Sequence, residues 1–329
     1  MSLPTMLSRI TKVSVTVLML WLLSRQLDWD ELLIILGDFT WWAFVVAIAI
    51  QIFTFILGTL RWQTFFRHEN LFYTLADLLR PYFIGALFNN ILPAATGGDV
   101  MRMYYILRKG HGAALAASPV ITERIIGSTV MFGIAISVLP FITIKANWLN
   151  LLSIVLPVAF MGLVIGLALL GWSATYQVIH RLFKRWEYYR PGRALLGVTN
   201  ASHRYLGDTP LVLRVASLSV LMQLIQIVVF WVLAMGIGSN ISFIQYALAV
   251  PLTLIVAGLP ISIGGLGVRE VAIVTLFSAI GMETSQATAV AILFLPVLIL
   301  SSLPGLYFFL TTRNHNALLR AAQQDKPLV

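Results

Sequence analysis

Residues 92–102 read LPAATGGDVMR, and residues 259–269 read LPISIGGLGVR. Both stretches fit the pattern L-P-x-x-x-G-G-x-x-x-R, and they lie 167 positions apart. Five fixed positions agree at a single offset, each time between two apolar arms, which indicates an internal repeat. The fold can be worked out from these two interruptions.

Each stretch breaks a helix inside apolar sequence. Pro93 and Pro260 have no amide hydrogen and stop the arm that enters. The pairs Gly97–Gly98 and Gly264–Gly265 permit left-handed backbone dihedrals and close approach by another group. Non-helical backbone is tolerated in hydrocarbon only where it is buried in protein or lines a wet cavity. We therefore expect each break to be the tip of a helical hairpin.

Composition places the chain in a membrane. Hydrophobic residues make up 59% of the 329 residues and charged residues 11%, against about 25% in an ordinary soluble domain. The hydrophobic residues are gathered in long blocks, and the net charge of +9 lies between them. We interpret that charge as fixing orientation in the bilayer rather than as binding nucleic acid. Without cysteine, a disulfide framework, a thiolate nucleophile and a cysteine metal site are excluded.

Six segments are long and apolar enough to cross a bilayer core, which takes about 20 residues of helix. They are residues 8–23, 39–60, 115–139, 149–172, 211–235 and 287–310. Residues 71–109 and 244–280 are each interrupted, and we interpret them as re-entrant hairpins that return to the side they entered from. The predicted fold is an all-α polytopic membrane protein with about six transmembrane helices plus two re-entrant broken hairpins.

The repeat divides the chain into two halves of the same order: two helices, a hairpin and a helix. The first membrane repeat covers residues 1–145, the second covers residues 146–312, and a cytoplasmic tail follows at 313–329. Each half crosses three times, so the second is predicted to be an inverted repeat of the first. The two hairpins then enter from opposite faces, and their tips approach the middle.

Charges at the ends of the segments predict the orientation. With the N-terminus inside, Arg61, Arg67, the pair Arg108–Lys109 and the basic connection at residues 173–210 all fall on the cytoplasmic side. The C-terminal tail falls there too, and the acidic loop after the first helix lies outside. This asymmetry follows the positive-inside rule. We expect a multi-pass protein of the bacterial inner membrane with both termini in the cytoplasm.

The hairpins also suggest a binding site. The departing arm of each begins a helix whose free amides and positive dipole end point into the membrane. Arg102 and Arg269 lie about one turn along these arms and add a fixed cation. Two helix N-termini and two arginines are expected to form a site for an anionic head group. The alternative is that the glycines only allow tight packing and the arginines only set orientation, with Glu270 neutralising Arg269.

Further charges lie at membrane depth. Glu123 and Arg124 come about two turns into the third long helix, where burying either alone is costly. We predict an ion pair that ties the first hairpin to this helix. Its acid is Glu123 or Asp99, and its base is Arg102 or Arg124. A structural pair and a transport role both stay open, and Val290 at the position equivalent to Glu123 makes the halves functionally unequal.

Asn89 and Asn90 are polar residues close to the first tip and are candidates for lining a cavity. No metal-ligand spacing, nucleotide-binding loop or nucleophile elbow occurs, so we expect no cofactor, no metal and no catalytic group. Two alternatives stay open. Asp28-Trp29-Asp30 could hold a divalent metal in a membrane glycosyl or lipid transferase acting on a polyprenyl-phosphate substrate. The basic connection could instead make the chain a scaffold for a lipid-synthesis partner.

Three stretches carry a resemblance to a known family: LPAATGGDVMRMYYILRKG at 92–110, ITERIIG at 121–127 and LPISIGGLGVREVAIV at 259–274. The chain resembles the membrane half of lysylphosphatidylglycerol synthases and the stand-alone YbhN-like proteins grouped with them. In the synthases this half is regarded as a flippase for aminoacylated phosphatidylglycerol, and a soluble aminoacyl-transfer domain follows it. We expect that domain to be absent here, so lysyl transfer is not expected. The family's motif positions correspond to Gly97, Gly98, Asp99, Arg102, Glu123, Arg124, Gly264, Gly265, Gly267, Arg269 and Glu270.

We therefore predict a lipid flippase or scramblase that moves an anionic phospholipid or a polyprenyl-phosphate-linked lipid across the inner membrane. The expected partners are membrane lipids with anionic head groups. A lipid-modifying enzyme or partner subunit is a further candidate, and nucleic acid is not expected. The sequence leaves open the lipid, the direction, the energy source and the oligomeric state.

Overall fold

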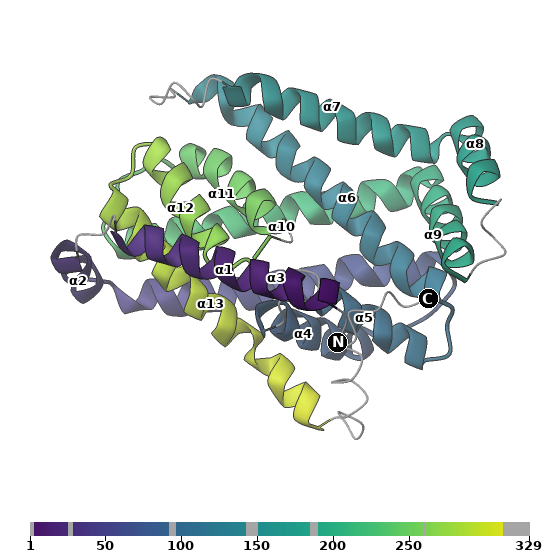
Figure 1. Ribbon diagram of the computed structural model, residues 1–329, viewed down its shortest axis with the longest axis horizontal. Helices are drawn as coiled ribbons and strands as arrows, with labels where there is room; N and C mark the ends of the chain where they lie inside the picture. The colour runs from purple at the N-terminus through teal and green to yellow at the C-terminus, as the bar shows by residue number, and fades with distance from the viewer. Residues whose placement is uncertain are drawn as a thin grey trace.

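The computed structural model describes residues 3–25, 29–91, 97–142, 151–184, 190–259, 261–262 and 264–311, and this part contains helices and no strand. The long helices lie side by side in one bundle (Figure 1). The α-helices are α1 Leu3–Arg25, α2 Trp29–Gly37, α3 Trp41–His68, α4 Leu75–Ile91, α5 Gly97–Arg108, α6 Ala113–Val138, α7 Leu152–Gly171, α8 Ser173–Lys184, α9 Arg190–Gly207, α10 Thr209–Gly236, α11 Phe243–Ala257, α12 Val268–Ala279 and α13 Thr284–Thr311. The predicted all-α class is confirmed.

Five of these helices are long and apolar enough to cross a membrane: α3, α6, α7, α10 and α13. They coincide with five of the six predicted spans. The remaining span, residues 8–23, lies in α1, whose apolar part is the shorter stretch Val13–Arg25. Outward faces carry exposed large side chains such as Val45 and Val158, as a lipid-facing surface requires. The chain is an all-α polytopic membrane protein.

Three parts of the chain are more helical than predicted. α3 runs on from residue 60 to His68, because Arg61 finds a polar partner inside the bundle. A short helix, α2, follows α1. The basic connection contains α8 and α9, and α9 packs Tyr205 against Phe65 of α3 with ring centroids 5.1 Å apart.

α3 and α10 pack along each other and run antiparallel. The amide of Thr40, just before α3, donates to the carbonyl of Gly236 at the end of α10 over 2.9 Å. Further along, Nη1 of Arg61 donates to the hydroxyl of Ser219 over 2.9 Å. Residue numbers therefore rise along one helix while they fall along the other.

The helix bounds recur at the offset found in the sequence. Shifted by 167 residues, α3 falls on 208–235, and α10 is Thr209–Gly236. Shifted likewise, α4 falls on 242–258, and α11 is Phe243–Ala257. The packing recurs as well, since α4 packs against α13 and α11 packs against α6. The two halves therefore interlock through equivalent pairs of helices.

α4 and α5 form one helical hairpin, and α11 and α12 form the other. The ends of the first meet where the Tyr73 hydroxyl lies 2.7 Å from Nε2 of His111. Burial is the main cause that raises the pKa of the Tyr73 phenol, so this group stays protonated and able to donate. The ends of the second meet where Nε2 of Gln245 donates to the carbonyl of Ile280 over 2.8 Å. Each hairpin returns to the end of the bundle from which it starts.

The tips of the two hairpins meet inside the bundle. Gly264 lies against the backbone at the end of α4, and a Cβ on it would be 3.1 Å from the Asn89 carbonyl and 3.3 Å from that of Asn90. Gly264 and Gly265 have φ values of 57° and 79°, so left-handed backbone is confirmed for this pair. Gly98 instead lies in the first turn of α5, without a positive φ.

The two ends of the bundle differ in charge. Glu69, just after α3, forms an ion pair with Arg204 of α9 at 2.9 Å. We call this region, at the right in Figure 1, the basic end. Its described basic residues include Arg67, Arg108, Lys109, Arg181 and Arg204. α2 packs against α13 at the opposite end. That end carries Asp30, Glu31, Asp38 and Glu283.

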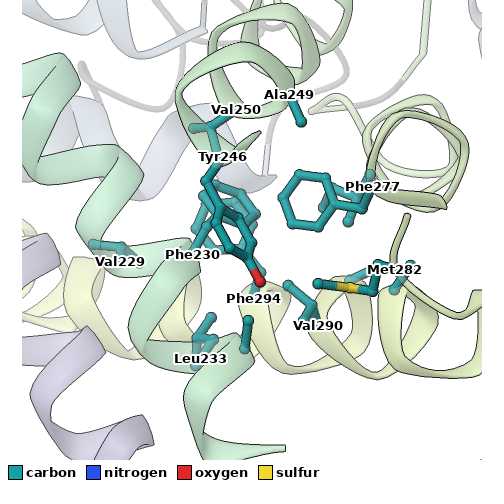
Figure 2. Close-up of a cluster of buried hydrophobic side chains, with 14 of the residues drawn as sticks. Val229, Phe230, Leu233, Tyr246, Ala249, Val250, Phe277, Met282, Val290 and Phe294 are labelled. Carbon is teal, nitrogen blue, oxygen red and sulfur yellow. The ribbon is translucent and has the colours of Figure 1, made fainter. Parts of the chain in front are cut away.

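An apolar core fills the second half (Figure 2). Phe230 of α10 and Phe294 of α13 have ring centroids 4.2 Å apart. Phe277 of α12 lies 5.5 Å from Phe230 and 5.5 Å from Tyr246 of α11. Because these rings come from α10, α11, α12 and α13, apolar packing contributes strongly to holding the second hairpin against its neighbours.

Gly305 of α13 lies against the backbone of Phe83 and Ile84, which lets α4 and α13 approach closely. We expect Gly305→Val to lower the free energy of unfolding by about 1–3 kcal/mol, because the new side chain pushes the helices apart. Thermal unfolding in detergent measures the change. Gly162→Val in α7 is the control, since a Cβ there meets nothing within 4 Å. Equal losses in the two variants would contradict this packing.

Candidate functional site

Arg102 of α5 is the centre of a buried group of charges. Its Nη2 lies 2.6 Å from Oδ1 of Asp99 on the same helix and 2.6 Å from Oε1 of Glu123 on α6. Both acids are buried, with 6% and 1% of their surface exposed. The first hairpin is therefore joined to α6 through one guanidinium group that two carboxylates share.

Two further arginines extend this group. Arg124 of α6 pairs with Oδ2 of Asp99. Arg61 of α3 places its Nε 3.6 Å from Oε2 of Glu123 while its Nη1 binds the Ser219 hydroxyl. The charged cluster is Arg61, Asp99, Arg102, Glu123 and Arg124. Three of its members are cations and two are anions, so the cluster keeps a net positive charge.

Aromatic rings enclose the central arginine. The guanidinium carbon of Arg102 lies 5.3 Å from the ring centroid of Trp62 and 5.0 Å from that of Tyr82. Such cation–π contacts stabilise a cation where water is excluded. Gly58 makes room for this arrangement, because a Cβ on it would overlap the phenol of Tyr82.

Three buried donors of this site have no hydrogen-bond acceptor among the residues that the structure describes. They are Nε of Arg61, Nη1 of Arg102 and Nε1 of Trp62. Arg61 Nε is too far from Glu123, at 3.6 Å, to form a hydrogen bond. A buried donor left unpaired costs about 1–3 kcal/mol, and more when it is charged. A ligand or water that accepts hydrogen bonds from these three donors would remove this cost.

Local sequence sets the position of α5 within the hairpin. Gly98 packs directly on the backbone of Gly85, so the two arms touch where neither has a side chain. Oδ1 of Asn89 accepts a hydrogen bond of 2.7 Å from the amide of Gly98 and caps the start of α5. Pro93 lies outside the described residues. The close approach of the arms brings Arg102 beneath Tyr82.

The second hairpin arranges its motif differently. Nη2 and Nε of Arg269 donate to Oε1 of its neighbour Glu270 over 2.7 and 3.0 Å. Oε2 of Glu270 accepts from the Gly267 amide over 2.6 Å, which caps α12. The guanidinium carbon of Arg269 also lies 5.6 Å from the ring centroid of Phe294. Arg269 is therefore neutralised within its own hairpin by Glu270, as the alternative in the sequence analysis predicted.

Three positions around Arg102 have apolar counterparts in the second half, although Arg102 itself corresponds to Arg269. At the offset of 167 residues, the counterparts of Trp62, Tyr82 and Glu123 are Val229, Ala249 and Val290. Figure 2 shows these three among the side chains of the apolar core, and all are at most 1% exposed. The two halves share one backbone plan but place a polar site in only one of them.

The structure brings together most of the predicted residues around the first hairpin. The predicted ion pair is confirmed for Asp99, Arg102, Glu123 and Arg124. Arg269 and Glu270 pair with each other instead of joining this group. Asn90 donates to the carbonyl of Leu298 and the hydroxyl of Ser302 on α13, both over 3.3 Å, so it anchors the tip.

Sequence reasoning missed four residues of the site: Arg61, Trp62, Tyr82 and Ser219. Arg61 was expected just past a helix ending at residue 60, but α3 continues and carries its guanidinium into the bundle, with 12% of the side chain exposed. The helical spacing of Gln51, Thr54 and Arg61 was the available signal, since it puts polar groups on one face of α3.

Removing one carboxylate should destabilise the fold. We expect Asp99→Asn to lower the free energy of unfolding by about 3–5 kcal/mol, because Arg102 and Arg124 lose a buried counter-charge. Thermal unfolding in detergent is the measurement. Asp77→Asn is the matched control, since Asp77 is an exposed carboxylate in the first turn of α4. A change in Asp99→Asn no larger than in this control would show that the cluster does not hold the hairpin.

Comparison with known proteins places this chain among membrane proteins. Residues 9–305 match the family described as the lysylphosphatidylglycerol synthase TM region. A UPF0104 membrane protein of Pyrococcus horikoshii is 24% identical over 274 residues, which cover 76% of this chain and 80% of that protein. The family match includes both hairpins, the charged cluster, four helices able to span a membrane and most of the fifth, α13. The chain is thus a multi-pass membrane protein that belongs to the lysylphosphatidylglycerol synthase transmembrane-region family.

Proposed function

We propose that this protein moves lipids with anionic, phosphate-bearing head groups across a membrane, as a flippase or scramblase. The transported lipid is an anionic phospholipid or a polyprenyl-phosphate-linked lipid. One observation carries the proposal: buried donors of Arg61, Trp62 and Arg102, around the guanidinium of Arg102, have no hydrogen-bond acceptor among the described residues, and they outnumber the one unpartnered acceptor there, Oε2 of Glu123. The name of the family, a membrane region of lipid synthases, supports the same class of ligand.

A phosphate group matches the chemistry of this site. Its oxygens accept several hydrogen bonds at once, and the planar guanidinium of arginine presents its donors in a matching fork. The net positive charge of the cluster favours an anion over a neutral head group. Phosphate bound there would supply acceptors to Arg61 and Arg102, and the ring of Trp62 would shield it from water.

The arrangement of the hairpins supports an inverted repeat. Equivalent helices α3 and α10 run antiparallel, each hairpin returns to its own end of the bundle, and the tips touch at Gly264 and Asn89. We infer that the hairpins are re-entrant and approach from opposite membrane faces. Inverted repeats with discontinuous helices are the common frame of alternating-access transporters, whose binding sites lie between the repeats.

Charge supports an orientation within the bilayer. The basic end carries Arg67, Arg108, Lys109, Arg181 and Arg204 and faces the cytoplasm by the positive-inside rule. The proposal therefore places both termini in the cytoplasm, and it retains the bacterial inner membrane that the sequence analysis expects.

A cavity at the basic end is suited to admit the lipid. It has a volume of about 630 Å³. Its lining combines Arg67 with Leu60, Phe72 and Leu75, so a cation lies beside apolar side chains. A phospholipid has the complementary form, with a charged head group next to acyl chains. Lipid enters here beside the mouth of the first hairpin.

The proposal gives the chain no catalytic step. Of the aspartates considered for a metal pair, Asp30 lies in the first turn of α2 and Asp28 lies outside the described residues. A lipid-modifying enzyme is a natural partner, because it would supply the lipid that this chain moves.

Trp62 offers the cleanest test of the site. We expect Trp62→Phe to weaken phosphatidylglycerol binding about tenfold, because it removes one buried donor, a loss of about 1.5 kcal/mol, and keeps an aromatic ring over Arg102. Translocation of fluorescent phosphatidylglycerol in proteoliposomes should fall with it, and Arg102→Gln should abolish it. Trp172→Phe is the control, since Trp172 is 63% exposed. Translocation by a folded Trp62→Phe protein equal to that of wild type contradicts this site.

The orientation has a separate test. The chain has no cysteine, so single thiols can be introduced. We expect Lys109→Cys, at the basic end, to react with an impermeant maleimide only from the cytoplasmic side. Glu283→Cys, at the opposite end, should react only from the other side, because the bundle separates the two ends. Labelling of both from one side rejects the proposed topology.

A further inference from the structure

Three buried glutamines lie between the two halves of the bundle. Gln51 belongs to α3, and Gln223 and Gln226 belong to α10. Their exposed fractions are 3%, 6% and 7%. Oε1 of Gln51, Oε1 of Gln223 and Nε2 of Gln226 have no hydrogen-bond partner in the described part of the chain. These amides are set in the protein interior with unused hydrogen-bonding capacity.

The three side chains lie at the middle of the α3–α10 contact. The register is fixed by Thr40 with Gly236 at one end and Arg61 with Ser219 at the other. Halfway between these contacts, Gln51 is level with residues 226–227 of α10. Ser219, Gln223 and Gln226 follow at spacings of four and three, which places them on one face of α10. On α3, the same spacing links Gln51 through Thr54 and Gly58 to Arg61.

One end of this polar face meets the site already described. At one end, the Arg61–Ser219 contact belongs to the charged cluster. In the second hairpin, the hydroxyls of Thr253 in α11 and Ser262 in the turn are also buried without a partner among the described residues. Unused buried polar atoms therefore occur on the first hairpin's site, on the α3–α10 contact and on the second hairpin.

Helix packing alone does not explain these amides. Glutamines that join helices do so by hydrogen bonds across the contact, and a buried amide with an unused donor or acceptor destabilises the packed state. Leucine has a similar volume and would fill these positions without that cost. Buried polar groups that lack partners call for a ligand or water as their explanation.

We propose that Gln51, Gln223 and Gln226 form an amide lane, a transient binding site for the phosphate and hydroxyl groups of a lipid head group between the two hairpins. This proposal rests on the proposed function. Neutral amides suit a passing site, because a ligand must bind well enough to enter and weakly enough to leave. An arginine at these positions would hold a phosphate, and leucine would exclude it.

The first experiment measures whether the lane admits polar molecules. Gln51→Cys, Gln223→Cys and Gln226→Cys proteins in phosphatidylcholine liposomes are treated with a small, water-soluble methanethiosulfonate. We expect these thiols to react about tenfold faster than that of Ile227→Cys, because thiol reactivity follows access. Ile227 is the matched control, adjacent to Gln226 and 0% exposed. Reaction no faster than in this control overturns the lane, whatever the transport result.

The second experiment identifies the occupant. Replacing phosphatidylcholine with phosphatidylglycerol should slow the reaction of the three lane thiols, because the head group occupies the lane. The reaction rate of Lys109→Cys, at the basic end, is the reference, because it shows how the altered surface charge changes the reaction of an exposed thiol. Equal slowing of Lys109→Cys and the lane thiols overturns occupation by the head group.

The third experiment connects the lane to transport. Gln51→Leu and Gln226→Leu should keep or raise the melting temperature and should still bind phosphatidylglycerol at the charged cluster. Their translocation of that lipid should fall about tenfold relative to Ile227→Leu, because the passing site is lost. Unchanged translocation in folded Leu variants overturns the lane while the proposed function stands. If wild type moves no lipid, the proposed function fails, and the two labelling experiments still decide whether the lane takes a head group.

Discussion

The guanidinium of Arg102 must be neutralised where it lies, because a cation held inside a membrane bundle has no water to stabilise it. Asp99 supplies one counter-charge from the same helix, and Glu123 supplies the other from α6. Arg61 reaches Glu123 from α3 and Ser219 from α10. One buried charge thus requires α3, α5, α6 and α10 to converge. The glycine contact between α4 and α5 and the cap from Asn89 then follow as the means of bringing α5 to that point.

The halves repeat a backbone plan but divide the chemistry. The second hairpin is held by packing of Phe230, Phe277 and Phe294, and its arginine is paired with the next residue along the chain. Apolar packing of this kind has no preference for an anion and resists rearrangement, because a dense core tolerates few alternative arrangements. The first half instead depends on charge pairs, whose balance a bound anion changes. Under the proposed function, the first half therefore holds the site that responds to a ligand, and the second half supports it.

The sequence was sufficient to predict features that avoid a large free-energy cost inside the membrane. Two interrupted apolar arms at one offset predicted the hairpins, and charges that could not stay unpaired predicted an ion pair of Glu123 or Asp99 with Arg102 or Arg124. It was not sufficient for Arg61, because hydropathy ends a span at the first charged residue, whereas α3 continues past it to reach Ser219. The conformation of Gly98 also escaped, since its requirement comes from contact with Gly85 in another helix. The features of Arg61 and Gly98 depend on which helices are in contact, and a single sequence does not reveal those contacts.

The proposed path of a head group has a physical order. At the first hairpin, fixed cations with unused donors give the strongest attraction for a phosphate. Along the α3–α10 contact, amides offer hydrogen bonds without charge. At the second hairpin, Arg269 is already satisfied by Glu270 and adds little attraction. Affinity for an anion thus falls from the basic end toward the opposite end. Because tight binding of an anion at the second hairpin would slow its release, the proposed path has the lipid leave there, where Glu270 already neutralises Arg269.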